Sequence, residues 1–236
     1  MSTVFEQYKT IEVNQMIELM REQIQSALSE ETAGSESNAC RFRRLKVQIP
    51  TLSPLLWLRN QKFDKKIYWS DRENKTEIAG IGIADYHKNE SKDNSQLLER
   101  LSSNLKRSDK NIRYFGGFKF DSNQPADRNW QNFGDNYFIL PRFEIFCFKG
   151  LTAFICNLHI EKDKQNHSQI LSELKTLSFS QEYEYPYVSN IISRADFPNK
   201  NQWFKNILVA FKAFDNKQYE KIVLARKTEL EFNKKL

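Results

Sequence analysis

The sequence predicts an α+β fold in which antiparallel β-sheets are covered by helices. Two observations support this class. Short runs of alternating or β-branched residues come in pairs around polar turns, which is typical of β-hairpins. Segments with apolar residues at three- and four-residue steps lie between those pairs, which is typical of amphipathic helices. The chain has 236 residues, 18 of them Phe and 9 Tyr, so it is long enough and aromatic enough to bury a sizeable core.

Residues 1–28 are assigned to an N-terminal amphipathic helix, because apolar side chains recur at helical spacing from Val13 to Leu28. Residues 29–40 are small, polar and acidic, which predicts a mobile linker. The next segment, 41–49, alternates like a half-buried strand. Its expected apolar face carries Leu45, Val47 and Ile49, and its expected polar face carries Arg44, Lys46 and Gln48.

The first predicted hairpin joins strands at 66–70 and 76–84 across a polar turn, and a short helix that Pro54 opens precedes it. Gly80 and Gly82 lie in its second strand and indicate a bulge or a close approach of another backbone.

Apolar residues at helical spacing then predict a helix over 94–106, with Asp93 as its N-cap. A strand follows over 112–120, and Gly116-Gly117 interrupts it. This glycine pair lacks the residues of a phosphate-binding loop, so we expect it to permit tight sheet packing.

The second predicted hairpin joins strands at 137–148 and 151–160 around Lys149-Gly150. Pro141 marks a bulge or an edge position, because proline cannot donate a hydrogen bond to a neighbouring strand. A two-residue turn at Lys149-Gly150 places Cys147 opposite Thr152 and Cys156 opposite Phe143. These two cysteines are then not partners, and with Cys40 they form neither a disulfide framework nor a zinc site.

The last third of the chain is expected to hold helices over 163–177 and 201–217, joined by a polar connection at 178–200. A short apolar, β-branched strand is expected to start at Lys221, directly after the second helix.

Composition excludes several classes of protein. No apolar run approaches the roughly 20 residues that span a bilayer, and residues 1–6 do not resemble a signal peptide, so we expect a cytosolic protein without membrane contact. The net charge is +6, but the 36 Lys and Arg are dispersed among 30 Asp and Glu. We therefore expect no nucleic-acid partner, although the basic balance suits capture of a small dianion.

Four sequence blocks, in order along the chain, resemble the isochorismate synthases of the chorismate-utilising superfamily, and they tilt toward the menaquinone-type enzymes. They are Ile67-Tyr68-Trp69-Ser70-Asp71-Arg72 leading into 77–84, Tyr114-Phe115-Gly116-Gly117-Phe118 within 114–121, 130–133 leading into Leu140-Pro141-Arg142-Phe143-Glu144, and Lys221-Ile222-Val223-Leu224-Ala225-Arg226. The resemblance covers most of the chain after the linker, so we assign 41–236 to the N-terminal part of a chorismate-binding domain. The N-terminal helix adds nothing to it.

The resemblance implies that chorismate is the substrate and that Lys221 is the general base on water. A lysine can accept a proton only when it is partly neutral, so its pKa must fall from the usual value of about 10.4. We expect desolvation on a strand face beside Val223 and Ala225 to lower it, with Arg226 and Lys227 as nearby cations. For an isolated lysine at a strand end, exposure to solvent would be the commoner outcome. Arg226 itself is expected to pair with a structural carboxylate.

The same resemblance implies Mg²⁺, held by Glu side chains against the substrate, and a carboxylate general acid. These family motifs lie downstream of the lysine, so we expect no metal ligand before Leu236. Structural or solvated roles are expected for the remaining candidates, which are Glu229, Glu231, Asp121, Glu144, His87, His159 and His167.

The family fold places antiparallel sheets of two similar halves face to face, and this chain resembles the first half. We therefore expect a truncated enzyme that is inactive alone and that self-associates or needs a complementing C-terminal chain. Two alternatives stay open: a non-catalytic or complementing subunit, and a salicylate synthase-type enzyme. The sequence also leaves open whether the product enters quinone or siderophore synthesis.

Overall fold

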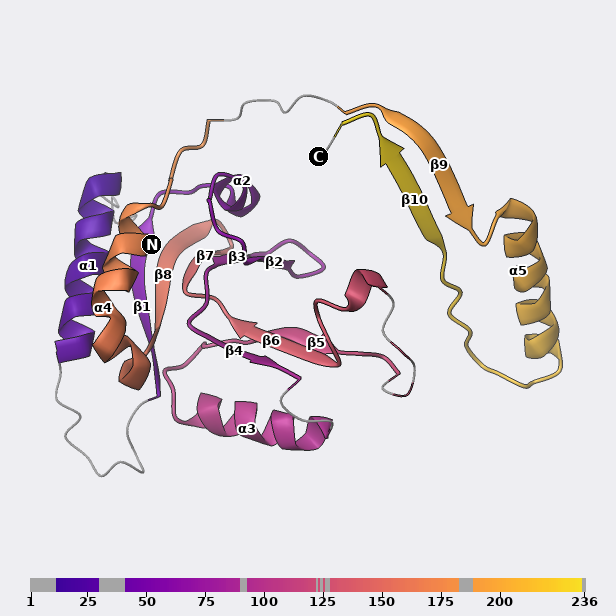
Figure 1. Cartoon of the computed structure of the whole chain (residues 1–236), viewed down its shortest axis with the longest axis horizontal. Coiled ribbons are helices and arrows are strands. Elements are labelled where there is room, and N and C mark those ends of the chain that lie inside the picture. Colours follow the sequence, from indigo (N-terminus) through magenta and orange to yellow (C-terminus); the bar gives the residue numbers. More distant parts are fainter. Residues whose placement is uncertain are drawn as a thin grey trace, which may run out of the picture. The chain divides into compact units, whose positions relative to one another are not determined.

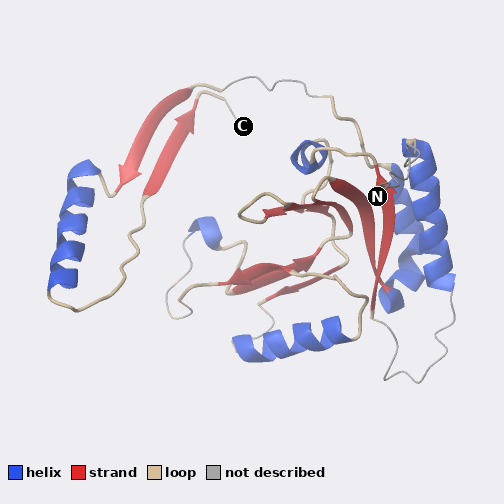
Figure 2. Cartoon of the chain, turned by 180° about the vertical axis from the view of Figure 1, so that it is seen from behind, coloured by secondary structure: helices blue, strands red, loops and turns tan. Residues whose placement is uncertain are grey.

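A computed structural model describes residues 12–29, 41–89, 93–121, 123, 125, 128–182 and 189–234, which fall in two compact units, 1–182 and 183–236 (Figures 1 and 2). The predicted linker therefore lies outside the described residues except for Ser29, and Cys40 lies outside them too. Among the described helices, none is long and apolar enough to cross a membrane.

The first unit contains two antiparallel sheets and four α-helices among its described residues. The helices are α1 (Val13–Ser29), α2 (Pro54–Arg59), α3 (Asn94–Lys106) and α4 (Ile160–Lys175). The strands are β1 (Phe42–Ile49), β2 (Lys66–Ser70), β3 (Thr76–Ile81), β4 (Asp85–Lys88), β5 (Phe115–Phe118), β6 (Asn136–Leu140), β7 (Phe143–Phe148) and β8 (Leu151–His159). The predicted fold class is confirmed.

The larger sheet has the order β1-β8-β7-β3-β2 and is antiparallel throughout. Helices α1 and α4 pack together against it (Figure 1). The main core forms between them. It includes Met20 and Ile24 of α1, Phe143 and Phe154 of the sheet, and Leu174 of α4. Helix α1 is therefore part of this core.

The prediction for the polar face of β1 is wrong at Arg44. Its guanidinium is buried rather than solvated, because Glu144 of β7 and Asn157 of β8 hold it in the sheet. Lys46 and Gln48 are exposed, as predicted.

The predicted strand over 137–148 is two strands that belong to different sheets. β6 pairs with β4 and β5, whereas β7 pairs with β3 and β8. The break falls at Pro141 and Arg142, where proline interrupts the ladder. Pro141 therefore sits where the chain passes from the smaller sheet to the larger one.

The smaller sheet has the order β4-β6-β5, and α3 lies beside it (Figures 1 and 2). Strand β4 was not predicted as a separate element, because the sequence suggested one strand up to residue 84. Strand β5, on the other side of β6, is shorter than predicted and contains the glycine pair instead of being interrupted by it.

Glycines allow the close approaches that the sequence indicated. A Cβ atom at Gly80 would lie 2.8 Å from the Cβ of Pro141, and Gly82 has φ +64°. The β7–β8 hairpin turns at Lys149 and Gly150, as predicted.

The predicted cysteine register is confirmed in that hairpin, since Cys147 lies opposite Thr152 and Cys156 lies opposite Phe143. Both thiols are free, and burial raises the pKa of Cys156 to about 12.

The second unit consists of β9 (Ile191–Phe197), α5 (Lys200–Asp215) and β10 (Lys227–Phe232), and β9 pairs with β10. Two predictions are wrong here. The expected connection at 178–200 contains β9, and the strand expected at Lys221 begins at Lys227 instead.

Candidate functional site

Lys221 lies in an irregular, solvent-exposed segment between α5 and β10. Pairing with β9 starts at Lys227, opposite Phe197, and the residue after Phe197 is Pro198, which has no N–H to donate. The chain before Lys227 therefore has no ladder to join. Within this unit Lys221, Val223 and Ala225 are exposed, so the expected strand face that would desolvate the lysine is absent.

Arg226 takes the structural role that the sequence suggested. Its guanidinium lies 2.7 Å from a carboxylate oxygen of Asp196, and the hydroxyl of Thr228 donates to the same carboxylate at 2.7 Å. These contacts, led by the Thr228 hydrogen bond, lower the pKa of Asp196. Arg226 thus anchors the start of β10 to β9.

Glu229 and Glu231 are exposed on β10, as predicted. Glu229 pairs with Lys227 at 2.7 Å, and Glu231 accepts a hydrogen bond from the Ser193 hydroxyl at 2.9 Å. Both carboxylates therefore have ordinary surface roles in this hairpin.

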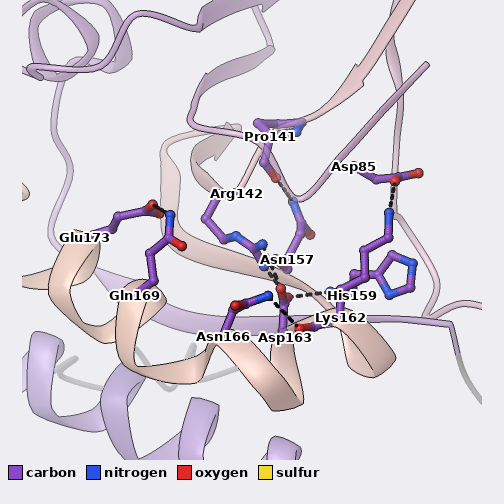
Figure 3. Close-up of polar contacts among 10 residues, drawn as sticks. All are labelled: Asp85, Pro141, Arg142, Asn157, His159, Lys162, Asp163, Asn166, Gln169 and Glu173. Atoms are coloured by element: carbon purple, nitrogen blue, oxygen red, sulfur yellow. Dashed lines mark hydrogen bonds and ion pairs between the residues drawn. The ribbon is translucent and has the colours of Figure 1, made fainter. Parts of the chain in front are cut away.

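The block around Pro141 and Arg142 is held by a buried ion pair. The Arg142 guanidinium contacts both carboxylate oxygens of Asp163 and donates to the carbonyl of Asn157 at 2.8 Å (Figure 3). Asp163 also accepts the backbone N–H of His159 at 2.7 Å. The pair joins the bend between the two sheets to the first turn of α4.

Glu144, two residues further on, is 1% exposed and binds Arg44 through both oxygens, at 2.9 and 2.8 Å. The side-chain amide of Asn157 also donates to it. The structural role expected for Glu144 is confirmed. No pattern in the sequence indicated its arginine partner, because Arg44 and Glu144 are 100 residues apart and meet only through the long-range pairing of β1 with β8 and of β8 with β7.

Asp121 accepts the backbone N–H of Asn123 at 2.9 Å, which is a turn contact. His167 is exposed on α4, as expected for an isolated histidine.

His87 has a structural role, as expected, and it has a carboxylate partner on its own strand. His87 and Asp85 share one face of β4, and their side chains meet at 3.1 Å. The hydroxyl of Tyr114 donates to Asp85 at 2.7 Å. The ammonium of Lys162 also donates to Asp85, at 3.1 Å, as Figure 3 shows. Burial alone would raise the pKa of Asp85, but the hydrogen bonds from His87, Tyr114 and Lys162 outweigh it and lower that pKa. This spacing of two residues on a strand was the signal that the sequence reading missed.

His159 is buried against the ring of Phe42, with the ring centres 4.9 Å apart. Burial lowers its pKa, and the charges of Lys162 and Arg41 act in the same direction. It is a buried core histidine whose surroundings favour the neutral ring over the charged one.

Among the described residues, no three His, Cys, Asp or Glu side chains lie close enough together to share an ion. The acidic side chains in the blocks have other partners: Asp71 and Asp121 accept backbone N–H groups, Glu77 accepts the hydroxyl of Tyr68, and Glu144 binds Arg44.

The fold and the four sequence blocks are consistent with the family that the next comparison shows. A family model described as chorismate binding enzyme matches residues 22–236, and the chain belongs to this family. The match includes Lys221 and begins inside α1.

Two isochorismate synthases are among the proteins that this chain resembles. It is 24% identical over 209 residues to isochorismate synthase MenF of Bacillus subtilis (strain 168), covering 79% of this chain and 44% of that relative. The structure matches MenF, the menaquinone-specific isochorismate synthase of Escherichia coli, with a TM-score of 0.61 and 22% identity. That match covers 92% of this chain and 47% of the other, and at this identity it establishes the fold. The chain thus spans about half the length of the relatives it matches.

Proposed function

We propose that residues 41–236 of this chain form the N-terminal part of an isochorismate synthase, an enzyme that converts chorismate to isochorismate. The observation that carries the proposal is the family match through residue 236, which includes the Lys221 segment. Both similar proteins described above are isochorismate synthases by name.

The proposed reaction adds water at one ring carbon while a hydroxyl leaves from another carbon of the same allylic system, so substrate and product are isomers. Lys221 would take a proton from the attacking water, and an acid would give a proton to the departing hydroxyl. No residue of this chain is assigned as that acid.

Lys221 needs a lowered pKa for this role, and its own unit leaves it exposed. We therefore propose that a further polypeptide surface covers Lys221 in the active enzyme and that the 236-residue chain is inactive alone. That surface would also supply the acid and the ligands of Mg²⁺, since no three His, Cys, Asp or Glu side chains among the described residues lie close enough to share an ion. We expect the enzyme to act in the cytosol.

The test is incubation of chorismate with the purified chain and Mg²⁺, followed by chromatography. The completed enzyme is measured in parallel. It is either a full-length protein from the same reading frame or this chain mixed with a separate polypeptide that completes it. The proposal predicts isochorismate only from the completed enzyme. Salicylate with pyruvate would indicate the salicylate synthase alternative, and a folded, completed assembly without turnover would indicate a non-catalytic subunit.

A further inference from the structure

A cavity of about 950 Å³ opens in the first unit, beside β2, β5, β6 and the segment that joins β5 to β6. Its size is within the range of small-molecule sites. Seven aromatic side chains line it: Tyr68, Phe115, Phe118, Phe120, Trp130, Phe133 and Tyr137. None of the lining residues belongs to the second unit, which carries Lys221.

The glycine pair in β5 forms part of the cavity wall. Gly116 has φ +156°, and a Cβ atom there would lie 1.8 Å from the carbonyl oxygen of Tyr137, so only glycine fits. A Cβ atom at Gly117 would meet nothing within 4 Å. The backbone at Gly117 therefore faces open space and carries no side chain that would keep a ligand away from it.

The aromatic rings of the cavity are unusually exposed. Trp130 is 64% exposed and Phe133 is 50% exposed, although their ring centres lie 5.6 Å apart. Phe133 also meets the ring of Tyr137 edge-on at 5.8 Å. These contacts orient the rings and leave ring surface free, which is the arrangement that stacks on a flat ligand.

Charge around the cavity is balanced. Three lysines line it, Lys65, Lys66 and Lys119, against two carboxylates, Asp64 and Asp121, and Lys119 also pairs with Asp135 at 3.4 Å. The amine of Lys66 donates to the carbonyl of Arg59 at 3.4 Å. Aromatic walls with balanced charge match a ligand whose main feature is a flat ring.

We propose that this cavity is a binding site for a planar aromatic molecule that stacks on its exposed rings. The inference does not depend on the function proposed above, because it uses neither Lys221 nor chorismate.

The test is isothermal titration of the purified chain with 2-naphthoate, with the Gly116 and Gly117 amide signals followed by NMR. We expect binding that shifts both amide signals. Two related probes separate the causes: 2-naphthamide lacks the charge, and decahydro-2-naphthoate lacks the flat rings. The decahydro probe should bind at least about fivefold more weakly than 2-naphthoate, whereas 2-naphthamide should bind within about twofold of it.

Gly117→Leu fills the open space and should weaken 2-naphthoate at least about tenfold, whereas Ser102→Leu on the exposed side of α3 should not change its affinity. Trp130→Ala removes an exposed ring and serves as a second variant, with an expected loss of about fivefold. The absence of binding, equal binding by 2-naphthoate and decahydro-2-naphthoate, or full affinity in both Gly117→Leu and Trp130→Ala would overturn the proposal.

Discussion

Arg142 and Asp163 form the ion pair that joins the bend between the sheets to α4. Both side chains are less than a tenth exposed, so removing one leaves the other as an uncompensated buried charge. This makes the pair a sensitive point of the fold, although a buried pair need not stabilise more than apolar residues would.

Asp163→Asn should therefore lower the free energy of unfolding by about 3–5 kcal/mol, measured by urea denaturation monitored by circular dichroism. Glu73→Gln is the matched control, because it removes a carboxylate from the exposed Lys75–Glu73 pair. Its cost should stay below about 1 kcal/mol. Equal effects of the two substitutions would contradict the account.

His159 predicts a pH dependence of stability. Its pKa is lowered in the fold by burial and by the charges of Lys162 and Arg41, while the unfolded chain has a histidine pKa of about 6.5. Below about pH 6.5 His159 binds a proton more readily in the unfolded chain than in the folded one. The contribution of neutral His159 to the free energy of unfolding is therefore fully present above about pH 6.5 and is lost as pH falls through the folded pKa.

His159→Phe removes the group that binds the proton and keeps an aromatic ring beside Phe42. Urea denaturation at pH 7.5 and 5.5 should show a smaller loss of stability in the variant, by up to about 1.4 kcal/mol per pH unit. An identical loss in both proteins would show that His159 is not the group responsible.

At the scale of elements, the pairing of β5 with β6 depends on one glycine. Gly116→Ala would place a methyl group 1.8 Å from the carbonyl oxygen of Tyr137, so β5 must separate from β6. Gly117→Ala meets no atom within 4 Å and should be tolerated.

We expect Gly116→Ala to cost more than about 2 kcal/mol of unfolding free energy and Gly117→Ala less than about 1 kcal/mol. Thermal unfolding of both variants checks this. A larger loss in Gly117→Ala than in Gly116→Ala would show that the close approach is wrongly placed.

Local patterns predicted most of these elements. Alternation located β1, and turn residues located the β7–β8 hairpin together with its cysteine register. The sheet to which each strand belongs was beyond such patterns, since the switch at Pro141 divides one apparently continuous run between two sheets. The segment after Lys221 has strand-like composition, but it has no partner strand in its unit, and pairing decides strand formation.

The candidate site shows the same limit. The role of Lys221 as general base comes from the family resemblance and stays a prediction. The structural roles expected for Glu144 and Arg226 agree with their ion pairs. The sequence missed Arg44 as a buried partner of Glu144, because that contact depends on a long-range strand pairing. The sequence also predicted that Lys221 is buried, whereas Lys221 is exposed within its own unit. Burial depends on which surfaces pack against a residue, and a local sequence pattern does not describe those surfaces.

For the whole molecule, the chain belongs to the chorismate-binding enzymes and spans about half the length of the relatives it matches. The second unit is a hairpin with one helix, and its apolar side chains are largely exposed, among them Phe204, Leu208 and Phe211 of α5. A two-stranded hairpin is marginal alone in water. This supports the proposal that a further surface completes the enzyme around Lys221.

The most direct test of the proposed role of Lys221 is conversion of chorismate by the completed enzyme with Mg²⁺, comparing wild type, Lys221→Ala and Lys205→Ala by chromatography. Lys205 is an exposed lysine of α5 and controls for loss of one positive charge. We predict isochorismate from wild type and Lys205→Ala, and a loss of at least about a hundredfold in Lys221→Ala while circular dichroism shows it folded. Turnover by Lys221→Ala at the wild-type rate would contradict the assignment of Lys221 as the general base.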